Sequence, residues 1–364
     1  MLDKKSPIPL YYQLSEHIKD QIESGIIVCG DKLPSEVEMI RQYDVARMTV
    51  RDALARLVNM GYLAKEHGRG TFCTYFPENS PGKKRLDIDV ILNMNDEYFI
   101  HYYVKGISNI LSSHDCNFII SDSNNDSHHI CKLLKDIAEK GSSGIIVQPS
   151  HLISTPEEEI CNIFKLLRRR NIPCVMINDL YECVENPSYL ALDEYGGGAL
   201  AARHLARLGH QRAGVVFIDN YRVFMSRRDG FVGEYSKLGL PSPVEIPITN
   251  ESDFEEAFIR AVSKDKLTAV FCASDNMARQ CADYLANAGL RIPADFSMIG
   301  YDDSLVAEMM IPKLTSVAHP KQEVGEMAAL ALVDIIRQKE SAKPFVHVFS
   351  TELVVRESTR AAYR

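Results

Sequence analysis

The chain has 364 residues, of which 46% are hydrophobic and 25% charged, and its formal net charge is −8. This length exceeds what one ordinary hydrophobic core covers and predicts two or three domains, and the composition excludes a disordered or fibrous protein. An acidic total does not exclude a nucleic-acid partner, because a sum over the whole chain hides local basic patches.

The nine cysteines are scattered along the chain without a C-x-x-C pair, and their number is odd. This spacing is typical neither of a disulfide framework nor of a zinc site, and we expect reduced cysteines packed as small apolar residues. No apolar segment of signal-peptide length stands at the start, and no window is long and apolar enough to span a bilayer. We therefore expect a cytoplasmic protein with no membrane partner.

The first 76 residues begin with two predicted helices. Apolar residues recur at helical spacing between positions 10 and 22 and predict an amphipathic helix over 9–24. Ser35 is followed three residues later by Glu38, which predicts a capping box at the start of the second helix. Asp44 marks the turn that follows it.

A third helix is predicted to carry arginines on its exposed side. Its buried face is expected to consist of Val50, Ala53, Leu54, Leu57 and Val58. That burial directs Arg47, Thr49 and Arg51 outward, with the two arginines one turn apart. Gly61 ends the helix, and residues 62–65 and 71–75 become the two strands of a wing around a glycine-rich turn.

The charge in this region is locally basic. Residues 41–69 hold six arginine and lysine side chains against three aspartate and glutamate side chains. A helix with arginines on one face, followed by a basic hairpin, is typical of a protein that reads double-stranded DNA. Residues 77–87 contain proline, glycine and serine followed by Lys83-Lys84-Arg85, and we interpret them as a linker. The basic triplet is either a solvated segment or a further phosphate contact.

From residue 88 to the end, short apolar runs alternate with helical stretches. The predicted strands are 88–92, 118–121, 144–148, 173–177, 214–218, 268–273, 296–301 and 346–355. The predicted helices between them include 99–112, 126–140, 156–170, 196–208, 276–288 and 321–338. Such alternation is typical of parallel α/β sheets covered on both faces. The number of strands favours two lobes, about 88–190 and 191–318, with the remaining C-terminal segment crossing back between them. A ligand would bind at the carboxyl ends of the strands between the lobes.

Residues 10–73 resemble the winged helix-turn-helix domain of the GntR family of bacterial transcription regulators. The resemblance rests on residues 10–14 (LYYQL), 33–36 (LPSE), 45–54 (VARMTVRDAL) and 68–72 (GRGTF). It implies a DNA interface made by Ser35, Glu36, Arg47, Thr49, Arg51, His67, Gly68 and Arg69. Ala46 departs from the pattern, because members of that family commonly have a serine there. We therefore expect one hydroxyl contact, to phosphate or as a helix cap, to be missing.

Residues 88–356 resemble the effector domain of the LacI family, which shares its fold with periplasmic sugar-binding proteins. The segments that carry this are 171–173 (NIP), 204–210 (HLARLGH), 227–231 (RRDGF), 273–275 (ASD), 299–303 (IGYDD) and 314–317 (LTSV). The combination of the two domains resembles the arabinose repressor family of Gram-positive bacteria. It implies a small sugar effector, L-arabinose or another sugar or sugar derivative.

Two charged residues are the foremost effector-binding candidates that the resemblance implies. Asp275 follows a predicted strand and Arg227 starts a predicted helix, and charged groups at a cleft hydrogen-bond strongly to hydroxyls. Two purely structural interpretations stay open. Asp275 could be the N-cap of the helix over 276–288, and Arg227 could pair with Asp229 or Glu234 on a solvated face.

The weaker effector candidates come from several places in the chain. His319 lies where the chain is expected to cross back between the lobes, and Asn178 and Asp193 end their segments. A sugar also needs an aromatic face, and the chain has no tryptophan. The aromatic candidates are Tyr98, Phe99 and Phe254.

Other motifs predict no further chemistry. His128 and His129 point to different sides of a helix and have no partner at ligand spacing, so we expect no metal. The run Gly196-Gly197-Gly198 lacks the context of a phosphate-binding loop, and no nucleophile arrangement is found. We therefore expect a protein that is not an enzyme and needs no cofactor.

The sequence thus predicts a transcriptional repressor of carbohydrate utilisation genes. A homodimer would place two winged helices on the half-sites of operator DNA, and the sugar would release them. Three alternatives remain: an activator of the same architecture, a sugar-binding protein without a DNA role, and an enzyme that uses the interlobe cleft.

Overall fold

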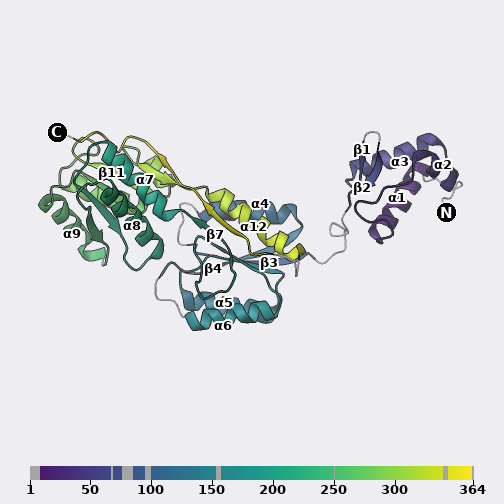
Figure 1. The fold of residues 1–364 in the computed structure, drawn as a ribbon, viewed down its shortest axis with the longest axis horizontal. Helices are drawn as coiled ribbons and strands as arrows, with labels where there is room; N and C mark the ends of the chain where they lie inside the picture. The colour runs from purple at the N-terminus through teal and green to yellow at the C-terminus, as the bar shows by residue number, and fades with distance from the viewer. Residues whose placement is uncertain are drawn as a thin grey trace. The chain divides into compact units, whose positions relative to one another are not determined.

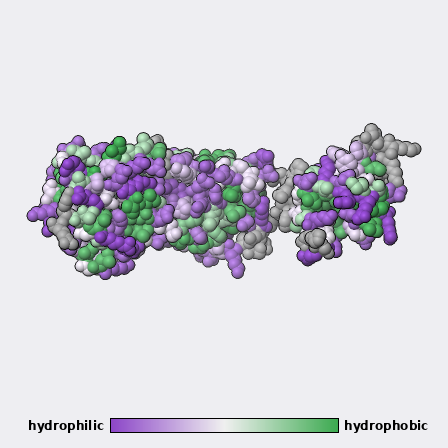
Figure 2. All heavy atoms as spheres, turned by 90° about the horizontal axis from the view of Figure 1, so that it is seen from above, coloured by the Kyte–Doolittle hydropathy of each residue, from purple (hydrophilic) through white to green (hydrophobic). Residues whose placement is uncertain are grey.

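The computed structural model describes residues 9–66, 69–75, 85–94, 100–152, 157–249, 251–338 and 343–362. The chain divides into two compact units, Met1–Arg85 and Leu86–Arg364. Among the described helices, none has the length and apolar character needed to cross a bilayer. Figure 2 shows hydrophilic side chains over much of the visible face, with apolar ones scattered among them.

The smaller unit is a winged helix-turn-helix of three helices and a two-stranded wing (Figure 1). Its elements are α1 (Leu10–Glu23), α2 (Glu36–Tyr43), α3 (Arg47–Asn59), β1 (Leu63–Glu66) and β2 (Gly70–Cys73). The two strands pair antiparallel. Apolar side chains of all three helices and of the wing form one core, among them Leu14, Ile18, Val50 and Leu57.

The ends of α2 and α3 follow from local chemistry. Ser35 accepts a hydrogen bond from the Glu38 amide while the Glu38 carboxylate accepts one from the Ser35 amide, so the predicted capping box is confirmed. Asp44 ends α2 in the left-handed conformation, at φ 48°. Ala46 is the N-cap of α3 and supplies no side-chain hydrogen bond. The predicted buried face of α3 is wrong at one position: Val58 was expected to be buried and is exposed.

The larger unit consists of two α/β lobes, each built on a six-stranded sheet. In the first lobe the strand order is β13-β7-β6-β5-β3-β4, and all neighbours are parallel. The strands are β3 (Leu86–Leu92), β4 (Cys116–Asp122), β5 (Gly144–Val147), β6 (Cys174–Ile177), β7 (Ser188–Leu192) and β13 (Val346–Phe349). The helices α4 (Ile100–Ser113) and α12 (Lys321–Gln338) cover one face, and α5 (Ser127–Lys140) and α6 (Glu157–Arg169) cover the other (Figure 1).

In the second lobe the strand order is β14-β12-β11-β10-β8-β9, parallel except for β14 against β12. The strands are β8 (Ala213–Phe217), β9 (Val244–Pro247), β10 (Ala269–Cys272), β11 (Ser297–Tyr301), β12 (Thr315–Ala318) and β14 (Glu352–Val354). The helices are α7 (Glu194–Arg207), α8 (Arg222–Lys237), α9 (Glu251–Lys264), α10 (Asp275–Asn287) and α11 (Leu305–Met309).

The chain passes between the lobes three times, after β7, after β12 and after β13. The single strand predicted over 346–355 is therefore wrong: its two halves are β13 and β14, which belong to different sheets. The C-terminal segment then stays on the second lobe, where Ser358 accepts a hydrogen bond from the Met298 amide.

The glycines of α7 and α8 allow the two helices to pack at backbone distance. A Cβ atom on Gly198 would lie 1.9 Å from the carbonyl oxygen of Arg227, and one on Gly230 would lie 1.9 Å from that of Tyr195. The glycine run 196–198 thus has a packing role, and it fixes the position of Arg227 at the edge of the second lobe.

Candidate functional sites: a nucleic-acid interface and an interlobe pocket

The predicted DNA-binding face surrounds the start of α3. Arg47 is 75% exposed, Arg51 is exposed and Thr49 is half-buried. Arg69, next to β2, is exposed, and its guanidinium lies 5.8 Å from the centre of the Phe72 ring. His67 and Gly68, which the sequence also placed at the interface, lie outside the described residues.

Glu36 sits among the basic groups of this face. Its carboxylate lies 3.6 Å from Arg47 Nε and 3.5 Å from Lys65 Nζ. One acidic group on α2 therefore holds a cation of the recognition helix and a cation of the wing close together. Ser35 has a different task, because its hydroxyl and amide are both engaged in the capping box.

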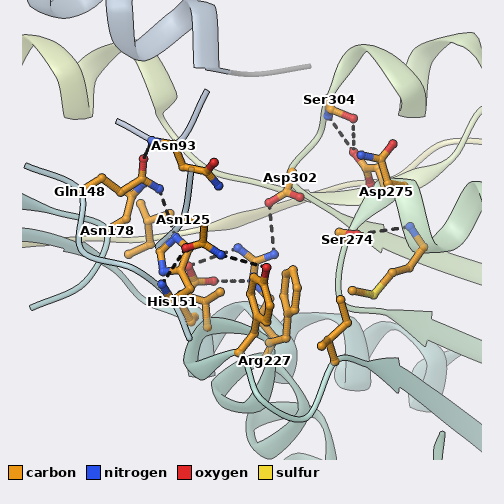
Figure 3. A pocket seen from close by; sticks show the side chains of 18 of the residues that line it. Asn93, Asn125, Gln148, His151, Asn178, Arg227, Ser274, Asp275, Asp302 and Ser304 are labelled. Carbon is orange, nitrogen blue, oxygen red and sulfur yellow. Dashed lines mark hydrogen bonds and ion pairs between the residues drawn. The ribbon is translucent and has the colours of Figure 1, made fainter. Parts of the chain in front are cut away.

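A pocket of about 410 Å³ lies between the two lobes of the larger unit, a size typical of small-molecule sites. The first lobe contributes mainly amides and an imidazole (Figure 3), namely Asn93, Asn124, Asn125, Gln148, His151 and Asn178. The second lobe contributes charged groups, namely Glu194, Arg227, Asp275 and Asp302, with His319 from the crossing after β12. It also contributes apolar and aromatic surface, from Ile218, Tyr221, Val223, Phe224, Ile248 and Met277.

Arg227 is the centre of the charged wall. Its guanidinium donates to both carboxylate oxygens of Glu194, at 2.6 and 3.2 Å, and to the Ala273 carbonyl at 2.7 Å. Its Nη1 also lies 3.2 Å from Asp302 Oδ1. Burial opposes the charged form of Arg227, but the carboxylates of Glu194 and Asp302 outweigh it and raise the pKa of the guanidinium above its usual value. The centre of the Tyr301 ring lies 3.6 Å from the guanidinium carbon, and this cation–π contact stabilises the charge of Arg227. The open alternative of a solvated pair with Asp229 or Glu234 is thereby excluded.

Asp275 is almost completely buried and held by two serines. Its Oδ2 accepts hydrogen bonds from the amide and hydroxyl of Ser304 at 2.7 and 2.8 Å, and its Oδ1 accepts one from Ser316 at 2.6 Å. Burial, together with the nearby charge of Asp302, raises the pKa of Asp275 to about 7. The helix-cap alternative is wrong, because Ser274 caps α10 by accepting from the Met277 amide. Asp275 therefore joins α10 to the loop after β11 and to strand β12, and it lines the pocket.

Asp302 links Arg227 to the crossing segment. Its Oδ1 lies 3.5 Å from His319 Nε2, and its backbone has a φ of 100°, which non-glycine residues rarely adopt. Burial opposes ionisation of Asp302, but Arg227 and His319 outweigh it and lower the pKa of the carboxyl. Burial lowers the pKa of His319, so that the imidazole is neutral near pH 7.

The amide wall of the first lobe is ordered by hydrogen bonds among its own members. Asn178 Oδ1 accepts from the Tyr103 hydroxyl at 3.1 Å. Gln148 Oε1 accepts from the backbone N–H of Asn93 at 3.2 Å, and Gln148 Nε2 lies 3.1 Å from His151 Nε2. These bonds fix the direction of the Asn178 and Gln148 side-chain amides before a ligand arrives, which lowers the cost of binding one.

The two lobes also contact each other directly at one side of the pocket. Arg222 Nε donates to Asp179 Oδ2 at 3.0 Å, and Arg222 Nη2 donates to the Ser150 carbonyl at 3.2 Å. Asn125 Nδ2 donates to the Tyr221 hydroxyl at 2.9 Å. Hydrogen bonds therefore join the two lobes at this side of the pocket.

Four of the predicted effector residues line this pocket: Asn178, Arg227, Asp275 and His319. Asp193 does not. Its carboxylate accepts from the Gly196 amide at 2.8 Å and caps α7, so its prediction as an effector ligand is corrected. Tyr98 and Phe99 lie outside the described residues.

The aromatic prediction of Phe254 is also corrected, because this ring packs against Phe258 and Tyr284 in the core of the second lobe. Tyr221 and Phe224 supply the aromatic surface of the pocket instead, with stacked rings whose centres are 5.2 Å apart. Within the described residues, no group of three or more His, Cys, Asp or Glu side chains is arranged to hold a metal ion.

Comparisons with known proteins agree with this architecture. Residues 10–73 match the gntR family of bacterial regulatory proteins, and residues 202–359 match a periplasmic binding protein-like domain. An arabinose metabolism transcriptional repressor of Halalkalibacterium halodurans is 32% identical over 368 residues, which cover 97% of each chain. Its counterpart in Geobacillus stearothermophilus is 29% identical and is matched over 98% of this chain and 99% of its own.

Among solved structures, a LacI family transcriptional regulator from Enterococcus faecium with bound ribose matches with a TM-score of 0.65 and 24% identity. The match covers 76% of this chain and 100% of that one, and it shows the shared two-lobed fold. The fold class and the family resemblance predicted from the sequence are confirmed. The chain belongs to the bacterial transcriptional regulators that join a GntR-type winged helix to a LacI-like periplasmic-binding-protein domain, the family of the arabinose metabolism transcriptional repressors.

Proposed function

We propose that the protein is a transcriptional repressor of carbohydrate genes that binds operator DNA and is released from it by a small sugar in the interlobe pocket. The observation that carries the proposal is the pocket itself. Amides of one lobe face the ionic and aromatic wall of the other across about 410 Å³, in a chain whose first unit is a winged helix. The relatives named as arabinose metabolism repressors support L-arabinose as the sugar, with another pentose as the nearest competitor.

The lining of the pocket suits an uncharged polyol. Carboxylates, amides and a guanidinium hydrogen-bond to neighbouring hydroxyls, and the Tyr221 and Phe224 rings offer a face to the C–H side of a sugar ring. The described lining contains three carboxyl side chains, Glu194, Asp275 and Asp302, against one guanidinium. This excess of acid disfavours a phosphate or a carboxylate on the ligand.

DNA binding is assigned to the exposed basic face of the winged helix. Arg47 and Arg51 lie on the side of α3 that the core does not cover, and arginine is the side chain that most often reads guanine in the major groove. A homodimer would present two such helices to the two halves of a palindromic operator. The sugar can relieve repression only if it favours an arrangement that fits the operator less well.

The test uses the purified full chain and a duplex enriched from a random DNA pool by the protein itself. Binding of that duplex is followed while L-arabinose, D-xylose, D-ribose, D-galactose or arabinose 5-phosphate is added. We expect a neutral pentose to release the DNA and the phosphate ester to have no effect. Release by the phosphate ester, or by none of the sugars, would contradict the proposed effector class.

Two variants separate the two functions. Arg47→Ala should lose DNA binding and keep sugar binding, whereas Arg227→Ala should lose sugar binding. Arg260→Ala is a matched control, since this exposed arginine of the second lobe pairs only with Glu256 on its own helix among the interactions described. Sequence-specific DNA binding that survives in Arg47→Ala would remove α3 from the interface.

A further inference from the structure

Met48 is a large apolar side chain exposed on the recognition helix. It is 61% exposed, although α3 buries Val50, Ala53, Leu54 and Leu57 in the core of the winged helix. The exposed position therefore needs an explanation other than packing within this unit.

The helical geometry places Met48 at the centre of the outer face of α3. Successive residues turn by about 100°, so Met48 lies about 160° around the axis from the buried Val50. On the same scale it lies about 60° from Arg51 and about 40° from Asp52. Met48 thus points away from the core, between a cation and a carboxylate, on the face that the proposed function assigns to DNA.

The major groove of DNA offers one apolar group to such a side chain, the C5-methyl of thymine. Arginine pairs with guanine through N7 and O6, but it cannot distinguish thymine by its methyl group. A methionine has a flexible and polarisable thioether that adapts to a small apolar partner. Contact with the methyl would remove both apolar surfaces from water.

We propose that Met48 is a specificity-determining residue that contacts the methyl group of a thymine beside the base read by Arg51. The inference rests on the proposed function, because it needs α3 to enter the major groove. It adds an apolar determinant to an interface otherwise described by its charges.

The test removes the methyl group from the DNA and the thioether from the protein separately. Each thymine of the enriched duplex is replaced in turn by deoxyuridine, which lacks only the C5-methyl, and the affinity of the full chain is measured. We expect one thymine in each half-site whose replacement weakens wild-type binding about 3- to 10-fold. Met48→Ala should weaken binding to the unmodified duplex by a similar factor and show no further loss at that thymine.

Met60 provides the matched control. It is a methionine on the same helix, 41% exposed, but it stands at the C-cap, about 18 Å along the axis from Met48. Met60→Ala should respond to each deoxyuridine as the wild type does, and Met48→Leu should retain the thymine preference because it keeps an apolar side chain. Melting temperatures of all variants establish that they are folded.

The outcomes separate the two levels of the proposal. If the wild type selects no duplex sequence, the proposed function itself fails. If it binds a sequence but Met48→Ala loses affinity equally at every deoxyuridine duplex and at the unmodified one, Met48 does not read a methyl group. The assignment is likewise overturned if replacement of that thymine by deoxyuridine weakens binding of Met48→Ala as much as binding of the wild type.

Discussion

Removal of the Arg227 guanidinium is the sharpest structural perturbation of the pocket. Arg227→Ala leaves the carboxylates of Glu194 and Asp302 without the cation that stands between them, at 2.6 and 3.2 Å in the intact structure. The Ala273 carbonyl also loses its donor. Because these groups are buried, water cannot replace the lost partner at low cost.

Breaking a buried ion pair in this way costs about 3–5 kcal/mol. For a domain of this size each kcal/mol shifts the melting temperature by roughly 2–4 °C, so we expect a decrease of about 6–20 °C at pH 7. Arg228→Ala is the control on the neighbouring residue. Arg228 pairs with Asp229 and Glu245, which are both exposed, and this loss should cost about 1 kcal/mol.

The pH dependence of stability provides a second measurement of the effect of Arg227→Ala. In the wild type Arg227 lowers the pKa of Asp302, so this carboxyl stabilises the fold above its unfolded pKa and loses that effect as the pH falls. Without Arg227, the neighbouring His319 and Lys321 still lower the pKa of Asp302, but burial raises it and meets less opposition. The ionised carboxyl should therefore stabilise the fold of the variant less than that of the wild type above the unfolded pKa.

Calorimetric melting at pH 4.5, 6 and 7.5 tests this reasoning for both variants. The difference in melting temperature between Arg227→Ala and the wild type should be widest at neutral pH and should narrow as the Asp302 carboxylate becomes protonated. A variant that melts within 2 °C of the wild type at pH 7.5, or a gap that grows at acid pH, would refute the assignment of Arg227 as the buried ionic centre.

Three further predictions follow from single positions. Gly198→Ala should destabilise the second lobe by about 1–3 kcal/mol and weaken sugar binding, because its Cβ would lie 1.9 Å from the Arg227 carbonyl oxygen; an unchanged melting temperature would contradict the close packing of α7 and α8. Ala46→Ser should stabilise the winged helix by about 1 kcal/mol in chemical unfolding, because it supplies the cap that α3 lacks; no gain would mean that the hydroxyl does not reach the helix. The pKa of Asp275 is about 7 in the fold against an ordinary value of 3.8, so the stability that its protonated form supplies is complete below about 3.8 and is lost as the pH rises through 7. The free energy of unfolding, measured between pH 5 and 8, should decrease with rising pH in the wild type and should depend less on pH in Asp275→Asn. Equal pH dependence in the two proteins would contradict the raised pKa of Asp275.

The features predicted best from the sequence are those that residues close together in the chain determine. The Ser35–Glu38 capping box follows from two residues three positions apart, and the helix α12 was predicted at its observed bounds of 321–338 because its amphipathic pattern is long. Short strands were harder to predict. The strands β7 (SYLAL), β9 (VEIP) and β12 (TSVA) were missed because polar residues or proline interrupt them, whereas the predicted β5 (GIIV) and β10 (AVFC) are continuous apolar runs.

The pocket shows the same limit in its chemistry. Asp193 and Glu194 are adjacent, yet one caps α7 and the other pairs with Arg227, 33 positions away. Nothing local distinguishes the two acids, because the turn at the helix start decides which of them faces the pocket. Asp302 was missed as a pocket residue for a related reason, since its role depends on both Arg227 and His319.

The proposed function requires the pocket and the DNA-binding face to be coupled. It is tested most directly by measuring the affinity of the full chain for L-arabinose by calorimetry, with and without a saturating amount of its enriched duplex. We expect the duplex to weaken sugar binding by the same factor by which the sugar weakens DNA binding, since the coupling of two binding equilibria is reciprocal. Equal sugar affinity in the presence and absence of the duplex would contradict it.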